Sequence, residues 1–225
     1  KLGRNTIVDL TDPRISVLLS KRESDGHAHG ELTMIRKDGT HISAEVSSAV
    51  FKDQEGLERT SMIVRDITER KRAEGALMES EKRFRSIFEN STVGMLMLSV
   101  DGNIQLSNNA IQNMLGYNDN EFKSMNFVDF THPDDIELSL KKQSTIYSGK
   151  WMEEKTIEKR YIAKDGHIVW VYISLAVVRD KSGKPQYHIA IIEDITARKR
   201  VEESLRESEE LFRHSFDYAA TGVCI

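Results

Sequence analysis

An internal repeat of about 128 residues is the feature that most constrains how this chain can fold. Asp66–Arg72 reads DITERKR, and Asp194–Arg200 reads DITARKR. Further matching segments flank these two on both sides: Glu79–Arg85 with Glu207–Arg213, and Ile35–Gly39 with Ile162–Gly166. The repeat predicts the second half of one unit, then one complete unit, then the beginning of a third.

Composition disfavours several classes of function. Charged residues make up 30% of the chain and the net charge is −4, so we do not expect nucleic acid as a partner. Apolar runs stay shorter than the roughly 18 residues of a membrane span, so we expect no membrane insertion by this segment. The single cysteine, Cys224, excludes an internal disulfide and fits a reducing compartment. The sequence therefore predicts a cytoplasmic location.

Strand and turn signals predict an antiparallel meander in each copy. Asp12 and Pro13 mark a helix start ahead of the first meander, with Asp12 as the cap. The first copy is expected to hold three strands, Glu31–Arg36, Thr40–Phe51 and Thr60–Asp66. The complete unit is expected to hold five, Gly94–Val100, Asn103–Ser107, Trp151–Ile162, His167–Arg179 and Pro185–Asp194, with helices at Asn108–Leu115 and Pro133–Ser148.

The repeat also selects the buried face of the strand His167–Arg179, which is apolar on both faces. Aligning Gly39 with Gly166 pairs one apolar set with another: Ile42, Ala44, Val46 and Val50 with Val169, Val171, Ile173 and Val177. The other face pairs polar residues with Trp170 and Tyr172. We therefore expect Trp170 and Tyr172 on the outer face, covered by a linker helix or a second chain.

The segments after each Asp-Ile-Thr predict long amphipathic linker helices. Apolar residues alternate at spacings of four and three, as in a coiled-coil seam interrupted by one serine. The two seams are Ala73, Leu77, Ser80, Phe84 and Phe88, and Val201, Leu205, Ser208, Phe212 and Phe216. This pattern favours a homodimer; the alternative is a helix that packs on its own domain.

Together, the strand order, His132-Pro133-Asp134-Asp135, the Lys-Asp-Gly turns, the strand Ile168–Val171 and the closing Asp-Ile-Thr resemble PAS domains with their C-terminal PAC segment. The resemblance implies an α+β PAS fold, a five-stranded antiparallel sheet with helices on one face, in tandem units joined by long amphipathic linker helices. The expected boundaries are 1–67 for the C-terminal part of a first PAS domain, 68–83 for a linker helix, 84–196 for a complete PAS/PAC domain, 197–213 for a second linker helix, and 214–225 for the first strand of a third PAS domain.

Catalytic and metal motifs are not found in the sequence. No histidine is followed by the acidic residue usual at a kinase phosphoacceptor, and no glycine-rich nucleotide loop accompanies any of them. His27 and His29 stand without further metal ligands, so we interpret them as a solvated loop. In domains of this family, the resemblance implies a bound flavin or haem only where particular residues are present. Asn118–Phe130 has no cysteine for a LOV-type flavin, and Pro133–Ser148 has no histidine for haem, so both cofactors are disfavoured.

A small-molecule ligand between helices and sheet remains open, with a packed core as the alternative. The candidate lining residues are Met97, Asn108, Met114, Leu115, Tyr117, Phe127, Ile136, Val171, Ile173, Leu175 and Ile191. The candidate interface residues are Leu77, Trp170, Tyr172, Val201 and Leu205, which would form a homodimer through the linker helices and the outer sheet face.

The Asp-Ile-Thr junction carries the main functional expectation. Asp194 and Thr196 can each cap the following helix, and Asp194 can pair with Arg198 or Lys199. By resemblance the junction couples the last strand to the signalling helix, with Asp66, Thr68 and Arg70 in the same roles. We expect a non-catalytic sensory and relay segment next to further PAS and output domains, in a parent histidine kinase. The alternatives are a structural dimerisation spacer without a ligand, or the sensor of a cyclase or transcription regulator.

Overall fold

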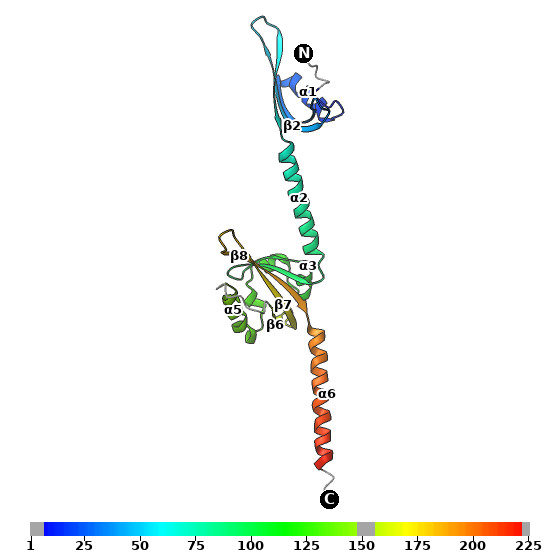
Figure 1. Ribbon diagram of the computed structural model, residues 1–225, viewed down its shortest axis with the longest axis vertical. Helices are drawn as coiled ribbons and strands as arrows, with labels where there is room; N and C mark the ends of the chain where they lie inside the picture. The colour runs from blue at the N-terminus through cyan, green and yellow to red at the C-terminus, as the bar shows by residue number, and fades with distance from the viewer. Residues whose placement is uncertain (1–6, 148–155, 222–225) are drawn as a thin grey trace. The chain divides into compact units, whose positions relative to one another are not determined.

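The computed structural model describes residues 7–147 and 156–221, with side chains for 7–145 and 156–213. Its contacts divide the chain into two compact units, Lys1–Arg83 (unit 1) and Phe84–Ile225 (unit 2) (Figure 1). Each unit has its own sheet and its own apolar core. In the described part of the chain, no helix is both long and apolar enough to cross a membrane.

Unit 1 is a three-stranded antiparallel meander with one helix packed against it. Its elements are α1 (Arg14–Asp25), β1 (His27–Ile35), β2 (His41–Lys52) and β3 (Glu58–Asp66), with strand order β1-β2-β3. Helix α1 ends at Gly26, whose φ of 73° is in the left-handed region that glycine adopts without strain. The interpretation of His27 and His29 as a loop is wrong, because strand β1 begins at His27.

Helix α2 (Thr68–Glu89) follows β3 after the single residue Ile67, and Phe88 is the one residue of the helix that is buried. After α2, unit 2 continues with β4 (Gly94–Ser99), β5 (Ile104–Ser107), α3 (Asn109–Leu115), α4 (Asp119–Lys123), the 3-10 helix η2 (Phe127–Phe130) and α5 (Pro133–Tyr147). The remaining elements are β6 (Thr156–Ile162), β7 (Ile168–Arg179), β8 (Pro185–Asp194) and α6 (Thr196–Thr221).

The sheet of unit 2 has five antiparallel strands in the order β5-β4-β8-β7-β6. Its core joins Leu96, Val171 and Ile192 of the sheet to Ile111 of α3 and Phe130 of η2. Four aromatic rings contact one another in sequence through the core, edge to face: Tyr117, Phe122, Phe130 and Tyr161. The fold is therefore α+β, with helices on the core face of an antiparallel sheet, as the sequence predicts.

The register of β7 follows the repeat. Val169, Val171 and Ile173 are buried, whereas Trp170 and Tyr172 alternate with them and are partly exposed. Helix α6 continues to Thr221, so the prediction of a strand over 214–225 is wrong for residues 214–221, which are helical. Residues 222–225 of that predicted strand, and the beginning of the strand expected at Trp151, lie outside the described residues.

Candidate functional site

The junction between β8 and α6 is fixed to the neighbouring strand β7 by two hydrogen bonds, one to the backbone carbonyl and one from the backbone N–H of Trp170. The Ile195 N–H donates to the Trp170 carbonyl at 2.8 Å, and the Trp170 N–H donates to Thr196 Oγ1 at 3.0 Å. Asp194 Oδ1 accepts the Thr196 N–H at 2.8 Å, and the Ile195 side chain is buried. The first residues of α6 are therefore attached to the sheet rather than simply following it.

The first copy repeats this arrangement around Ser43, which is equivalent to Trp170. The Ile67 N–H donates to the Ser43 carbonyl at 2.9 Å, and the Ser43 N–H donates to Thr68 Oγ1 at 3.1 Å. Asp66 Oδ1 accepts the Thr68 N–H at 2.9 Å. Hydrogen bonds from Thr68 lower the pKa of Asp66 to about 2, with Arg36 contributing from 2.5 Å. Because the strand supplies only backbone atoms, its side chain differs between the copies without changing the geometry.

A glutamate on the edge strand binds the basic residues of each linker helix. Glu158 on β6 pairs with Arg198 and, at 2.7 Å, with Lys199. Glu31 on β1 pairs with Arg70 at 3.2 Å and with Lys71 at 2.6 Å. The Lys71 ammonium lowers the pKa of the Glu31 carboxyl, and the Lys199 ammonium does the same for Glu158.

These pairs correct one expectation. Arg198 and Lys199 bind Glu158, whereas the Asp194 carboxylate accepts the Thr196 N–H, so Asp194 acts as a cap rather than as their ionic partner. Sequence reasoning missed Glu158. The repeat contained the signal, because Glu31 and Glu158 occupy equivalent positions.

The outer face of the sheet is partly covered by the start of α6. Lys199 Nζ and the Arg160 guanidinium each lie 5.5 Å from the centre of the Trp170 ring. Both are cation–π contacts that place charge over an otherwise exposed aromatic ring. Beyond this point the apolar residues of the linkers are exposed, with 71% of Leu77, 69% of Val201 and 60% of Leu205 accessible to solvent.

At the other end of unit 2, the buried Asn108 side chain joins three elements. Its Oδ1 accepts the N–H groups of Met95 in β4 at 2.8 Å and of Ile111 in α3 at 3.1 Å. Its Nδ2 donates to the carbonyls of Phe88 at 2.9 Å and Val93 at 3.0 Å. Asn108 is thus the cap of α3 and holds the end of α2 against β4, and all four of its hydrogen-bonding positions face protein rather than a ligand.

A cavity of about 60 Å³ lies between the sheet and α5. Three of the expected lining residues do line it: Phe127, Ile173 and Leu175. Leu115 and Val171 are fully buried in the core, Met114 and Tyr117 pack against that core, and Ile136 is partly buried on α5.

The expectation that Met97 and Ile191 line the interior needs correction. Leu96 and Leu98 line the cavity, so Met97 between them points to the opposite face. Ile191 is 42% exposed between the buried Ala190 and Ile192. Both strands carry apolar residues on both faces, which is why their pattern did not reveal the buried side.

Sequence reasoning also missed Lys159, which lines the cavity and is 4% exposed. Its Nζ donates to Thr131 Oγ1 and to Ser139 Oγ, each at 3.1 Å, and lies 5.0 Å from the ring centres of Phe127 and Tyr161. Burial lowers the pKa of Lys159 to about 7. The signal was present, because strand periodicity places Lys159 on the face shared by Ile157 and Tyr161.

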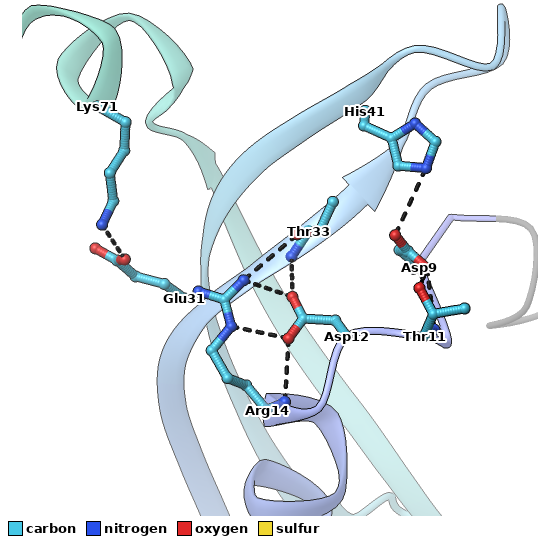
Figure 2. Close-up of polar contacts among 8 residues, drawn as sticks. All are labelled: Asp9, Thr11, Asp12, Arg14, Glu31, Thr33, His41 and Lys71. Atoms are coloured by element: carbon cyan, nitrogen blue, oxygen red, sulfur yellow. Dashed lines mark hydrogen bonds and ion pairs between the residues drawn. The ribbon is translucent and has the colours of Figure 1, made fainter. Parts of the chain in front are cut away.

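Unit 1 contains a buried carboxylate whose role is structural (Figure 2). Asp12 accepts the backbone N–H of Arg14 at 3.0 Å and of Thr33 at 2.8 Å, and binds the Arg14 guanidinium through both oxygens. Arg14 holds the pKa of the Asp12 carboxyl well below its usual range. Asp12 therefore binds the N–H of the first residue of α1 and also attaches that helix to β1, although Pro13 rather than Asp12 occupies the N-cap position that the sequence predicted for Asp12. Within the described residues, no three histidine, cysteine or acidic side chains are grouped to hold a metal.

The chain is similar to known proteins over most of its length. A family model described as PAS domain matches residues 2–69 and 92–197. The probable diguanylate cyclase DgcE of Escherichia coli strain K12 is 35% identical over 127 residues, covering 56% of this chain and 11% of that protein. Sporulation kinase E of Bacillus subtilis strain 168 is 27% identical over 203 residues, covering 88% of this chain and 25% of that protein. The chain thus spans a quarter or less of these relatives.

Among solved structures, the PAS domain of an HTR-like protein from Haloarcula marismortui is 28% identical. The match covers 56% of this chain and 99% of that one, with a TM-score of 0.45.

Proposed function

Because the chain belongs to the PAS domain family, we propose that it is a sensory and relay segment in which a change in the sheet of unit 2 alters the start of α6. The observation that carries this proposal is the duplicated junction. The same hydrogen bonds attach α2 to the Ser43 backbone and α6 to the Trp170 backbone, through Thr68 and Thr196. A helix attached in this way must respond when its strand moves.

A continuous set of contacts connects the two ends of unit 2. Asn108 links the Phe88 carbonyl at the end of α2 to the Met95 N–H in β4. Met95 pairs with Ile191 in β8, and β8 leads directly into Asp194. This path supports relay from one linker helix to the next.

The parent protein is proposed to be a sensor histidine kinase, and the similarity to sporulation kinase E supports a kinase output. The similarity to a probable diguanylate cyclase supports cyclase output as the second candidate. In both cases the segment itself supplies no catalytic group. The single cysteine and the high content of charged residues support a cytoplasmic location.

In such a parent, Asp194→Ala is expected to reduce stimulus-dependent output while leaving the sheet folded. The change removes the carboxylate that holds the Thr196 N–H, and a lost cap costs about 1 kcal/mol. The measurements are autophosphorylation or cyclase activity, and urea unfolding of the same variant. Equal losses of activity and stability would contradict a specific coupling role and would favour a structural spacer.

We also propose a homodimer whose interface is formed by the linker helices and by the outer sheet face around Trp170 and Tyr172. Leu205→Glu is expected to weaken self-association at least about tenfold, because it places a charge among the apolar residues that a coiled coil buries. Sedimentation equilibrium over a concentration series measures the effect.

Arg206→Ala is the matched control, since it also lowers the net charge by one unit but lies on the other side of α6. Arg206 pairs with Glu203 at 2.6 Å, which is on the same helix. The two variants should therefore differ. Unchanged association in Leu205→Glu, or a monomeric unmodified chain, would show that α6 does not carry the pairing.

A further inference from the structure

The cavity of unit 2 has a positively charged wall. Two lysines line it, Lys142 and Lys159, and among the described residues that line it there is no aspartate or glutamate. Lys142 Nζ is held at 2.6 Å by the Thr156 carbonyl at the cavity edge. Most of the remaining wall is apolar and includes Leu98, Phe127, Ile157, Ile173, Leu175 and Ala190. A ligand that fits this surface has an apolar body and a negative charge.

The hydroxyls around Lys159 leave it one hydrogen-bond donor for such a ligand. Thr131 Oγ1 donates its own hydrogen to the Phe127 carbonyl at 2.7 Å, and Ser139 Oγ donates to the Asp135 carbonyl at 2.7 Å. Each hydroxyl must therefore accept from Lys159. An ammonium has three N–H donors, so a third remains, and within the described residues no acceptor occupies it.

Extending the sensory function proposed above, we propose that this cavity binds a short-chain monocarboxylate whose carboxylate accepts the third N–H of Lys159. The alkyl chain of the ligand lies along the apolar wall. A volume of about 60 Å³ corresponds to about four or five water-sized positions, which suits an acid of about three to five carbon atoms. Butyrate is the probe of this size.

Ionisation of the surrounding groups agrees with this assignment. Burial lowers the pKa of Lys159 to about 7, and the nearby Asp135 carboxylate opposes that shift while it is itself paired with Arg160. Burial also lowers the pKa of His188 and raises that of Tyr161, so both are neutral at pH 7. Lys142 adds a second positive charge. A bound carboxylate therefore stabilises the ammonium form of Lys159, and above pH 7 binding takes up a proton.

Calorimetric titration of the whole chain with butyrate tests the proposal. If only the ammonium form binds, affinity should fall about 30-fold between pH 6 and pH 8.5. Butyramide has the same shape without the charge and should not compete. Both measurements use the unmodified chain, so they remain decisive if a variant fails to fold.

Lys159→Met should weaken butyrate binding at least about tenfold and remove its pH dependence. Lys142→Met, which changes charge at the cavity edge, should retain the pH dependence. Absent binding, equal binding of butyramide, or unchanged affinity in Lys159→Met would each overturn the proposal. The proposed role of the junction is tested independently, because the Asp194→Ala experiment needs no butyrate. If Asp194→Ala behaves as expected and butyrate does not bind, only the ligand assignment fails.

Discussion

Lys159→Met is expected to raise the free energy of unfolding of unit 2 by about 2–3 kcal/mol at pH 7, and to leave it unchanged or lower it by up to about 1 kcal/mol at pH 10. An unfolded lysine has a pKa of 10.5, whereas burial lowers that of Lys159 to about 7. Between these values the unfolded chain binds a proton that the native protein does not, so the native state loses stability as the pH falls from 10.5 to 7 and loses no more below that. The resulting cost is about 4 kcal/mol at pH 7 and about 1 kcal/mol at pH 10.

Methionine removes this cost because it does not ionise and fills a similar space. The bonds from Lys159 to Thr131 and Ser139 are lost, which offsets about 1–2 kcal/mol at every pH. Urea unfolding from pH 7 to pH 10, without carboxylate buffers, measures the difference between the two proteins. Tryptophan fluorescence reports on unit 2, since Trp151 and Trp170 both belong to residues 84–225.

Lys142→Met is the matched control for this titration. Lys142 lines the same cavity but is partly exposed, so its replacement measures the effect of losing a lysine there that is not buried. A pH-independent difference for Lys159→Met would show that Lys159 is not held in a depressed ionisation state, and would remove the expected proton uptake on carboxylate binding.

Asn108→Ala is expected to lower the free energy of unfolding of unit 2 by about 3 kcal/mol. Asn108 is 0% exposed, and its loss leaves the N–H groups of Met95 and Ile111 and the carbonyl of Phe88 without their bonds. Buried backbone groups without partners carry the full cost of removal from water. The change also detaches the end of α2 from β4. Urea unfolding followed by tryptophan fluorescence measures the loss.

Asn118→Ala provides the comparison, because Asn118 caps α4 with the same bond to a third-position N–H but at the surface. Its loss should cost about 1 kcal/mol. If Asn108→Ala were as mild as Asn118→Ala, the amide would be an ordinary helix cap, and the proposed path from α2 to β8 would lose its first step.

The internal repeat made much of this architecture predictable. It identified which residues of β7 face the core. Val171 aligns with the apolar Ala44 of the first copy, whereas Trp170 aligns with the polar Ser43. It also located the junction at Asp194 and Thr196. In both cases, two copies of the repeat adopt the same geometry, so the residue types that they share indicate what the fold requires and those that differ indicate what it tolerates.

The cavity was less predictable, for two physical reasons. Met97 and Ile191 belong to strands that are apolar on both faces, so periodicity could not choose between the interior and the outer face. Lys159 was missed because a charged residue in a strand is normally exposed, and its burial depends on hydroxyls from Thr131 and Ser139 that are distant in sequence. Contacts of that range are set by tertiary packing and leave no local pattern.

Hydrogen exchange in the linker helices is the most direct test of the central claim, that the Asp-Ile-Thr junction couples the sheet to α6. In Asp194→Ala, amides of residues 197–204 should exchange about fivefold faster, while β4 and β8 keep their protection. Asp66→Ala should have the same effect on the start of α2 and leave α6 unchanged. Exchange that is unchanged at the start of α6, or that rises equally across the sheet of unit 2, would contradict the claim.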